Sequence, residues 1–556
     1  MQPMRSHGVS LAFSTVVFLS SAAIPLAAAP TIASIQNAAS NLVPGLPNAG
    51  LAQGSIFIIK GSGLGPAKIS IAAKPFQSTT LDGTSVAVTA GGTKVDALMY
   101  YTSDGQVAAL LPSNTPTGPG SFTVTYNGQT SNTVQHGIQV SAPGVFTIDS
   151  TGIGPAIVTY ADYSLVSSYK AANCGGPNTT CGAANPGDTL ILWLTGLGPV
   201  NGDDASGAGL GVNFPNLPLN VWLGGVHASV QYQGRSGCCI GEDQIVFTVP
   251  NNVPTGCSVP LVLQVGNFVS NTTPMPVAVG SRSCNLLDPA IAQIDPSQVS
   301  GTVTIGAPEL DHFVNDSGPG FQDFLQPNFF SFTVPTALQP FIGTLLSNIP
   351  IGTCTASQIT PGPGLDSEVF TNASVLDAGP NFTINGPGGS MTVTAGDKVS
   401  LSSTGAFLVP GDYTLTGTGG KDVGPFSVKI TIPALPRLTN PGSPQGFTIA
   451  RTKGLIVNWN PNDSGTHVEV VISSFIGNNL GARVACTAPV NAGILTIPDY
   501  VLLALPNGNG TNFNFQPGDG PGGPATNSVF SATGLAVGLG QSFVDGIAFG
   551  GFPITN

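Results

Sequence analysis

The chain has 556 residues, of which 41% are hydrophobic and only 8% are charged, and it contains 74 Gly and 48 Pro. A chain of this length normally divides into several domains, and its apolar content is sufficient for a core in each. The low charge and the frequent Gly and Pro argue against coiled coils, long exposed helices and disorder. With 15 Lys and Arg against 27 Asp and Glu, the net charge of −12 excludes the basic footprint of a nucleic-acid-binding protein.

Residues 1–29 are predicted to be a secretory signal peptide. Arg5 and His7 precede an apolar run from Leu11 to Leu26, and small residues follow at positions 27–29. This order of residues is typical of a signal that is removed after export. The alternative is a permanent anchor, but the run is shorter than the ~20 residues of a spanning helix, and no later segment is long and apolar enough to span. We therefore expect a secreted or cell-surface protein with no transmembrane span after signal removal.

Beyond this segment, short apolar runs alternate with Gly, Pro, Asn and Ser. Examples are Gly54–Lys60, Ser121–Tyr126, Asp188–Leu194 and Gln244–Val249. Runs of five to eight residues that are rich in β-branched and aromatic side chains predict strands, and the turn residues between them predict antiparallel connections. No convincing 3.6-residue periodicity is present. The fold class is therefore predicted to be all-β.

An internal repeat divides the first half of the chain. Four short motifs return in the same order with nearly constant spacing: Gly-Leu-Gly-Pro at 63–66 and 196–199, Gly-Gly at 91–92 and 224–225, Pro-Thr-Gly at 116–118 and 254–256, and Ser-Asn-Thr at 131–133 and 270–272. Such a period indicates two copies of one β-sandwich module. We place these copies at residues 30–145 and 146–284.

These motifs, together with Ala142–Thr147 and Asn185–Asp188, resemble an uncharacterised C-terminal domain family known mainly from acidobacterial secreted proteins. The halves of that family look like the immunoglobulin-like IPT/TIG fold, and the resemblance covers roughly residues 31–283. The family usually has Gln-Ile-Asn before its Pro, whereas Ala108 and Val246 occupy the Asn position here. The resemblance implies an exported protein of tandem immunoglobulin-like β-sandwich modules. It brings no established activity, cofactor or site residue.

The second half of the chain lacks this repeat. Leu408–Leu415 contains a Pro-Gly turn that predicts a hairpin, and Phe426–Pro433 predicts a strand. Residues 434–447 are rich in Pro and Gly and are predicted to form a linker. Two alternating strands, Gly454–Asn460 and His467–Ser473, follow the linker. We therefore predict a third β-sandwich domain at residues 285–436 and a small C-terminal β-sandwich domain at residues 437–556.

The eight cysteines are predicted to form disulfides. They are Cys174, Cys181, Cys238, Cys239, Cys257, Cys284, Cys354 and Cys486. Their spacing does not match a zinc site, and an even number in an exported chain favours disulfides. Cys174 and Cys181 flank a short flexible segment, and Cys257 and Cys284 belong to strands that we expect to be neighbours, so we predict these two pairs. For Cys238 and Cys239, the alternatives are a bridge between these two adjacent residues or pairing elsewhere. A bridge between Cys354 and Cys486 would have to span two domains.

The chain is poor in groups that could carry catalysis. It has five His, and it contains neither the H-E-x-x-H metal motif nor the G-x-S-x-G serine motif. Its glycine-rich segments lack the Lys-Ser/Thr of a phosphate loop. We therefore expect no enzyme activity and no cofactor. The alternative is a secreted glycan hydrolase with ancillary sandwich modules, whose paired carboxylates would come from Glu309, Asp311, Asp323 or Glu368.

Two groups of residues are candidates for ligand contact. Glu309, Asp311 and Asp316 lie in the densest polar segment, and their oxygens suit Ca²⁺, although a solvated loop is the alternative. Trp193 and Trp222 alternate with Leu and Val, so both indoles point outward if the aliphatic residues face the core. An outward indole could stack on a sugar ring, and coverage by another sheet or module is the alternative.

The expected function is that of an exported, non-catalytic surface protein of tandem β-sandwiches, which acts in adhesion or in matrix or glycan contact. Binding would lie on loops or on a sheet face. The expected partner is a polysaccharide or another surface protein. A purely structural spacer without a ligand is a further interpretation.

Overall fold

The computed structural model describes residues 28–169, 181–207, 209–285, 302–314, 321–341, 344, 348–360, 371–394, 396, 398–401, 406–441, 447–463, 465–477, 480–508, 510–517, 528–544 and 546–556. Most of the expected signal peptide, residues 1–27, lies outside these ranges. Strands dominate the described residues, and the helical segments are short: η1 (Asp204–Ser206), η4 (Thr336–Phe341), η5 (Val490–Ala492) and α3 (Asp499–Leu502). The all-β prediction is confirmed. No helix in the described ranges has the length and apolar character that crossing a bilayer requires.

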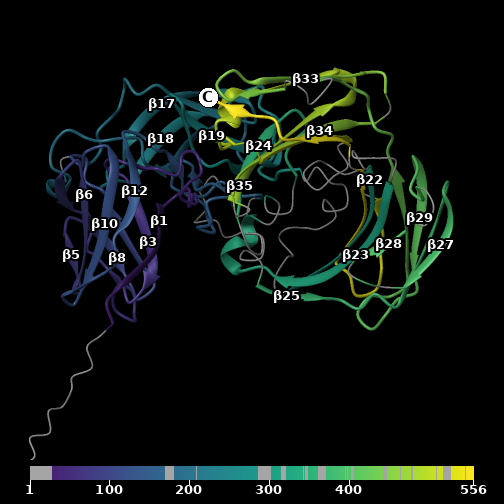
Figure 1. Ribbon diagram of the computed structural model, residues 1–556, viewed down its shortest axis with the longest axis horizontal. Coiled ribbons are helices and arrows are strands. Elements are labelled where there is room, and N and C mark those ends of the chain that lie inside the picture. The colour runs from purple at the N-terminus through teal and green to yellow at the C-terminus, as the bar shows by residue number, and fades with distance from the viewer. Residues whose placement is uncertain are drawn as a thin grey trace, which may run out of the picture.

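The first module is a sandwich of two sheets (Figure 1). Its strands are β1 (Thr31–Asn37), β2 (Leu51–Ala52), β3 (Ile56–Ser62), β4 (Ser70–Ile71), β5 (Thr80–Leu81), β6 (Thr84–Ala90), β7 (Thr93–Asp96), β8 (Leu98–Thr102), β9 (Gln106–Leu110), β10 (Gly118–Tyr126), β11 (Gln129–Thr130) and β12 (Val134–Gln139). One sheet has the order β1-β3-β9-β8-β4 and the other β2-β12-β10-β6-β5, with β7 paired to β6 and β11 to β10. The alternating side chains of both sheets meet in one core, where the rings of Phe57 and Phe122 pack edge to face 5.6 Å apart.

The second module repeats this strand pairing. Its strands are β13 (Gly144–Val145), β14 (Val158–Thr159), β15 (Thr189–Thr195), β16 (Leu219–Leu223), β17 (Val226–Arg235), β18 (Asp243–Thr248), β19 (Gly256–Val265), β20 (Phe268–Val269) and β21 (Thr273–Val277). The order β13-β15-β18-β17 matches β1-β3-β9-β8, and β16, β19 and β21 match β6, β10 and β12. The long strand β17 pairs with both β16 and β18, with a register shift between Val230 and Tyr232, so the two halves form one bent sheet.

The repeated motifs occupy equivalent places in the two modules. Gly63 follows β3 with φ +65°, and Gly196 follows β15 with φ +99°, a backbone region that favours glycine. The Asn of each Ser-Asn-Thr motif holds the first strand of its module. Asn132 accepts from the Ile32 N–H (2.7 Å) and donates to its carbonyl (3.1 Å), and Asn271 does the same to Val145 at 2.8 and 3.0 Å. The repeat is therefore structural, as the sequence predicts.

The C-terminal half contains two further sandwiches, which we call sandwich A and sandwich B. Sandwich A consists of β22 (Thr302–Val314), β23 (Phe321–Thr333), β25 (Thr371–Val375), β26 (Asn381–Gly386), β27 (Gly389–Thr394), β28 (Val399–Ser400), β29 (Gly411–Gly417), β30 (Phe426–Ile432), β38 (Ser528–Val529) and β39 (Val537–Val544). One of its sheets has the order β25-β23-β22-β39-β38, with β28 paired to β23, and the other has the order β27-β26-β29-β30. Their facing side chains form one core.

Sandwich B is assembled around a five-stranded sheet of order β24-β35-β34-β37-β40. Its strands are β24 (Cys354–Ile359), β31 (Leu438–Asn440), β32 (Ile449–Ala450), β33 (Leu455–Trp459), β34 (His467–Gly477), β35 (Leu480–Pro489), β36 (Ile494–Ile497), β37 (Gly510–Pro517), β40 (Ile547–Gly550) and β41 (Ile554–Thr555). The small sheet β31-β33-β36 lies in the same sandwich, and its core residues pack with those of β34 and β35.

These two sandwiches correct the expected boundary near residue 436. β39 comes from the expected last domain, yet it pairs in parallel with β22, with Ile305 opposite Val537 and His312 opposite Val544. β24 comes from the expected third domain, yet it pairs with β35. The sequence boundary is wrong because the local strand pattern shows where strands lie but not which distant strand completes each sheet.

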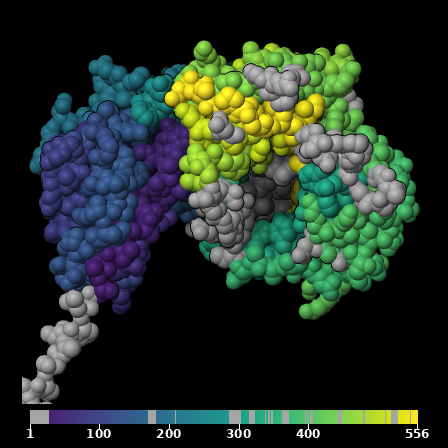
Figure 2. Space-filling view, viewed as in Figure 1, coloured from purple at the N-terminus to yellow at the C-terminus, as the bar shows by residue number. Residues whose placement is uncertain are grey.

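The modules share cores and surfaces. In Figure 1 the purple and blue first module lies on the left, the teal second module lies at the top between the halves, and sandwiches A and B form the right-hand lobe. Val262 and Val269 of the second module are part of the core of sandwich B. In Figure 2 the first module and sandwich B lie side by side, and Asn48 joins them by donating to the Leu503 carbonyl at 3.1 Å. The chain is thus an interlocked assembly rather than a row of independent modules.

Candidate functional site

Trp193 lies on the half-exposed face of β15. Leu190, Leu192 and Leu194 alternate with it and are buried in the core of the second module, so the indole points away from that core. Its N–H donates to Thr159 Oγ1 of β14 at 3.0 Å. Gln244 of β18 lies directly opposite and is also half-exposed. The alternation of Leu residues with Trp193 in the sequence therefore predicts correctly that the indole points outward.

Tyr163 extends the aromatic surface of Trp193. The two ring centroids are 6.2 Å apart, the planes are inclined by 38°, and Tyr163 is 69% exposed. Tyr163 has φ +62° in a short turn, in which its N–H donates to the Tyr160 carbonyl and Asp162 Oδ1 accepts from the Ser164 N–H and hydroxyl. We call Trp193 and Tyr163 the aromatic platform. The sequence analysis did not identify Tyr163. Its position between Asp162 and Ser164, two residues that favour turns, could have indicated an exposed aromatic side chain.

Trp222 requires a correction, because it is not available for a sugar. Its ring stacks on Tyr500 of α3, with centroids 4.7 Å apart and planes inclined by 7°. Its N–H donates to Gln264 Oε1 at 3.2 Å, and His227 packs edge to face against it at 5.4 Å. Trp222 does leave the core of its own module, as its alternation predicts, but sandwich B covers it there. The local pattern contains no information about that neighbour.

Two of the three calcium candidates share one face of β22. Glu309 is half-buried and Asp311 is 1% exposed, and alternate residues of a strand point to the same side. Asp311 Oδ2 accepts from Gln326 Nε2 at 2.5 Å and lies 3.9 Å from Lys398 Nζ. Asp316, the third candidate, lies outside the described residues.

The charges of this pair are only partly compensated. Burial, followed by the charge of Asp311, raises the pKa of Glu309 to about 7, and burial raises that of Asp311 to about 6. Lys398 opposes both shifts, but its Nζ also lies over the rings of Phe324 and Phe313, at 4.0 and 4.8 Å from their centroids. Asp311 Oδ1 is buried and accepts no hydrogen bond from the described residues.

The remaining hydrolase candidates do not join this pair. Asp323 lies on β23, where its Oδ1 is 2.7 Å from His312 Nδ1 and its Oδ2 accepts from the backbone N–H groups of Phe407 and Leu408. These contacts hold a loop of sandwich A against β23, and they give Asp323 a structural role. Glu368 lies outside the described residues. Among the described candidates, Asp323 therefore does not face Glu309 and Asp311 across a cleft, as the carboxylates of a glycoside hydrolase do.

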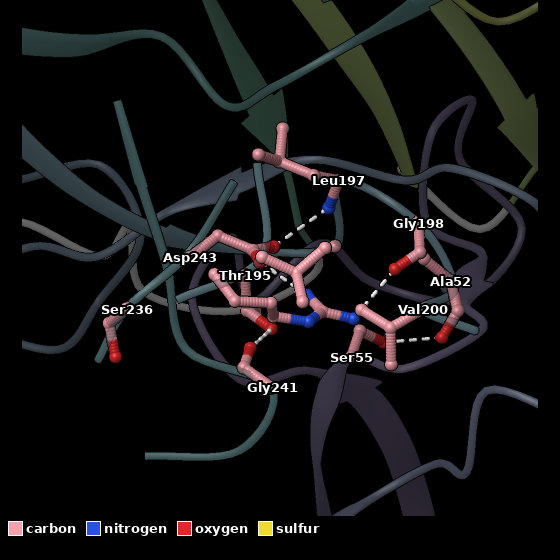
Figure 3. Close-up of polar contacts among 12 residues, drawn as sticks. Ala52, Ser55, Thr195, Leu197, Gly198, Val200, Ser236, Gly241 and Asp243 are labelled. Carbon is pink, nitrogen blue, oxygen red and sulfur yellow. Dashed lines mark hydrogen bonds and ion pairs between the residues drawn. The ribbon is translucent and has the colours of Figure 1, made fainter. Parts of the chain in front are cut away.

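A buried ion pair lies at the junction of the first and second modules (Figure 3). Arg235 at the end of β17 and Asp243 at the start of β18 are paired, with side chains 1% and 0% exposed. Arg235 Nη2 donates to the Gly198 carbonyl at 2.6 Å, and Asp243 Oδ2 accepts from the Leu197 N–H at 2.9 Å. The pair therefore fixes the repeated Gly-Leu-Gly-Pro turn at residues 196–199. Gly54 of the first module lies against the guanidinium, because a Cβ atom at this position would clash with Arg235 Nη2. Sequence reasoning did not predict this pair.

Hydrogen bonds between the modules surround this ion pair. Asp204 of the second module accepts from the Ser113 N–H (2.6 Å) and hydroxyl (3.0 Å) of the first. Thr195 Oγ1 accepts from the Ile56 N–H at 2.9 Å and donates to the Gly241 carbonyl at 2.7 Å. Each of these groups is buried, so the junction excludes water from its polar contacts.

Three disulfides join described residues. Cys257 and Cys284, one of the predicted pairs, are bonded with Cα atoms 5.0 Å apart. Cys238 is bonded to Cys239. The other predicted pair is Cys174 and Cys181. Cys181 is in a disulfide, but Cys174 lies outside the described residues, so this pairing stays a prediction.

The third of these bridges joins Cys354 to Cys486, which are directly opposite on β24 and β35. It therefore links neighbouring strands of one sheet and does not span two domains. Near the adjacent pair, Glu242 brings a third potential ligand atom within 4.8 Å of both sulfurs, but those sulfurs are already bonded to each other.

Comparison with known proteins supports the immunoglobulin-like character of the first module. Residues 43–142 match the IPT/TIG domain family. The expected IPT/TIG-like fold is therefore supported for that module. No curated protein matches the chain.

Several solved structures resemble the chain at low identity. Domains 5–6 of the S-layer protein SbsC are 10% identical, cover 45% of this chain and 100% of their own, and give a TM-score of 0.17. SGBP-B from a complex xyloglucan utilization locus in Bacteroides uniformis is 12% identical, with 67% and 86% coverage and a TM-score of 0.16. Domains 4–9 of SbsC are 11% identical, with 94% and 65% coverage and a TM-score of 0.18.

Proposed function

We propose that this protein is an exported, non-catalytic surface protein that contacts polysaccharide through the aromatic platform of Trp193 and Tyr163. The exposed ring of Tyr163 beside the fixed indole of Trp193 is the observation that carries the proposal. Aromatic side chains offer a large flat apolar surface at a small cost in conformational entropy, and they suit the C–H faces of sugar rings.

The surroundings of the platform support binding rather than core packing. The indole N–H of Trp193 donates to Thr159 Oγ1, so the ring is oriented before a ligand arrives. The half-exposed amide of Gln244, which lies opposite Trp193, offers both a donor and an acceptor for sugar hydroxyls. A surface with few charged groups matches a neutral polysaccharide better than an acidic or basic partner.

The disulfides support an extracytoplasmic location, because such bonds form and persist in oxidising compartments. We also infer that both repeats belong to the secreted-protein family that their motifs resemble. The matched contacts of Asn132 and Asn271 favour this inference, because they give the repeated residues the same structural task in each copy.

The test is affinity electrophoresis of the secreted full-length chain in gels that contain neutral polysaccharides. We expect retardation by at least one polysaccharide, a loss of at least tenfold in affinity for Y163A and W193A, and a smaller loss for Y163F, which keeps the ring. Tyr126→Ala, in the first module, removes a half-exposed tyrosine away from the platform and is the matched control. Unchanged retardation of both platform variants would contradict the proposal.

A parallel assay of released reducing ends addresses the hydrolase alternative. We expect no turnover on the retarding polysaccharide. Turnover that disappears in E309Q would make the protein an enzyme and would overturn its non-catalytic assignment. If no polysaccharide retards the wild-type chain, the interlocked module junctions favour a structural spacer.

A further inference from the structure

The face of sandwich A that points away from its own core carries several side-chain oxygens. Leu310, Leu325 and Val544 lie in the core between the two sheets, so the residues that alternate with them lie on the opposite face. Glu309 and Asp311 of β22, Gln326 of β23 and Gln541 of β39 occupy that face. We call these four residues the acidic patch.

Strand pairing brings the four residues of the acidic patch together. Glu309 is opposite Gln326 in the antiparallel pair of β22 and β23, and it is opposite Gln541 in the parallel pair of β22 and β39. Asp311 and Gln326 are in direct contact through their side chains. The patch thus spans three adjacent strands with one carboxylate pair and two amides, each amide having one oxygen.

Asp311 provides the observation that points to a ligand. Its side chain is 1% exposed, and its Oδ2 is occupied by Gln326 Nε2 and faces Lys398 Nζ. Its Oδ1 is buried and accepts no hydrogen bond within the described chain. A buried carboxylate oxygen without a partner loses its hydration without compensation, and native proteins rarely retain such an atom unless something binds it.

The charge balance of the patch also favours a cation. Two carboxylates face one ammonium group, and Lys398 is already engaged with the rings of Phe313 and Phe324. Glu309 makes no ion pair or hydrogen bond with another described residue, although it is half-buried beside Asp311. The rings of Phe313, Phe324 and Phe543 pack together at the next positions of the same strands, and they lower the local dielectric constant.

We propose that Glu309 and Asp311 bind one Ca²⁺ on this face, with Asp311 Oδ1 as a ligand and the amide oxygens of Gln326 and Gln541 available to complete the site. Calcium takes six to eight oxygen ligands in flexible geometry, and water can supply those that the protein does not. Magnesium requires a near-ideal octahedron and keeps its waters, so a site with two carboxylates from one strand favours the larger ion. This inference is independent of the aromatic platform.

The test is calorimetric titration of the EDTA-treated full-length chain with CaCl₂ and, separately, MgCl₂. We expect one site per chain with a dissociation constant on the order of 10⁻⁴–10⁻³ M for Ca²⁺, in the range of extracellular calcium modules, and weaker binding of Mg²⁺. D311N and E309Q should each weaken Ca²⁺ binding at least tenfold. Asp412→Asn is the matched control, because Asp412 is an exposed carboxylate of β29 that pairs with Lys429, and it should leave binding unchanged.

Thermal unfolding of the same proteins provides a second measurement. Adding 10 mM Ca²⁺ should raise the Tm of the wild-type chain and of D412N clearly more than that of D311N or E309Q. In EDTA, D311N should be at least as stable as the wild type, because an amide replaces a carboxylate that lacks its ligand. No heat and no Tm shift for the wild type at 10 mM Ca²⁺ would overturn the proposal, as would wild-type affinity in both variants. E309Q alters a half-buried residue and serves as the test if D311N does not fold.

Discussion

The buried ion pair at the module junction allows a quantitative prediction for Arg235→Met. The substitution keeps much of the apolar stem and removes the guanidinium, which leaves Asp243 fully buried with the Leu197 N–H as a remaining partner at 2.9 Å. Breaking a buried pair by removing one member costs about 3–5 kcal/mol, since the other charge stays desolvated. For an unfolding unit of about 150–250 residues, the approximate size of the two joined modules, this corresponds to a decrease in Tm of about 6–20 °C.

The cost of Arg235→Met should depend on pH. Burial raises the pKa of Asp243, and Arg235 is the main group that opposes this effect. Without Arg235 the folded-state pKa rises further above the unfolded value, so the folded chain takes up a proton more readily than the unfolded chain. The destabilisation should therefore be full at pH 8 and should shrink as pH falls toward 5.

The measurement is urea unfolding of the full-length chain, followed by tryptophan fluorescence. Trp193 and Trp222 lie in the second module and report the transition that contains the junction, whereas Trp459 lies in the core of sandwich B and reports that sandwich. The double variant R235M/D243L removes both charges and should be clearly more stable than R235M, because an apolar pair avoids the desolvated charge. A decrease in the free energy of unfolding of less than about 1 kcal/mol for R235M would refute this account. A decrease for the double variant that equals the sum of those for R235M and D243L would also refute it.

Three further predictions concern other parts of the chain. Asn271→Ala should destabilise the second module by about 1–3 kcal/mol in urea unfolding, because it leaves buried backbone groups of β13 unpaired, whereas Asn132→Ala should cost less, since Asn132 is exposed and water replaces its contacts. Glu469→Gln should stabilise the chain at pH 7–8, because burial raises the pKa of Glu469 and penalises its ionised form more than the partly exposed Arg483, 3.7 Å away, stabilises it. This gain should disappear as pH falls through the folded pKa to below 4.5, and a constant gain across that range would contradict the explanation. Peptide mapping without reduction should recover Cys174 and Cys181 in one linked peptide, and two free thiols would exclude that pair.

The sequence predicted the parts of the fold that depend on local pattern. The alternation in β15 gives the outward direction of Trp193, and the repeated motifs give the equivalence of the first two modules. The same alternation gives the direction of Trp222 but not its neighbour Tyr500, which lies far away in the sequence. Direction is encoded by a period of two residues, whereas the neighbour depends on how distant segments pack.

The candidate sites show the same division. Glu309 and Asp311 were identified, with Asp316, as calcium candidates, and the structure places the two on one face of β22. Gln326 and Gln541 were not identified, since amides on separate strands have no common motif until the sheet pairs them. Arg235 was also missed, because a single arginine in a strand gives no sign that an aspartate eight residues later shares its burial.

The interleaving of sandwiches A and B has a consequence for the assembly of the chain. In sandwich A, β22 pairs with β39, which follows it by more than two hundred residues. The segment between them contains β24, which pairs with β35 in sandwich B. Pairings at such separations close large loops and are slow to form, so the two sandwiches must mature together after the whole segment has emerged. A chain cut near residue 436 would expose the long edge of β22 and would be prone to strand-to-strand aggregation.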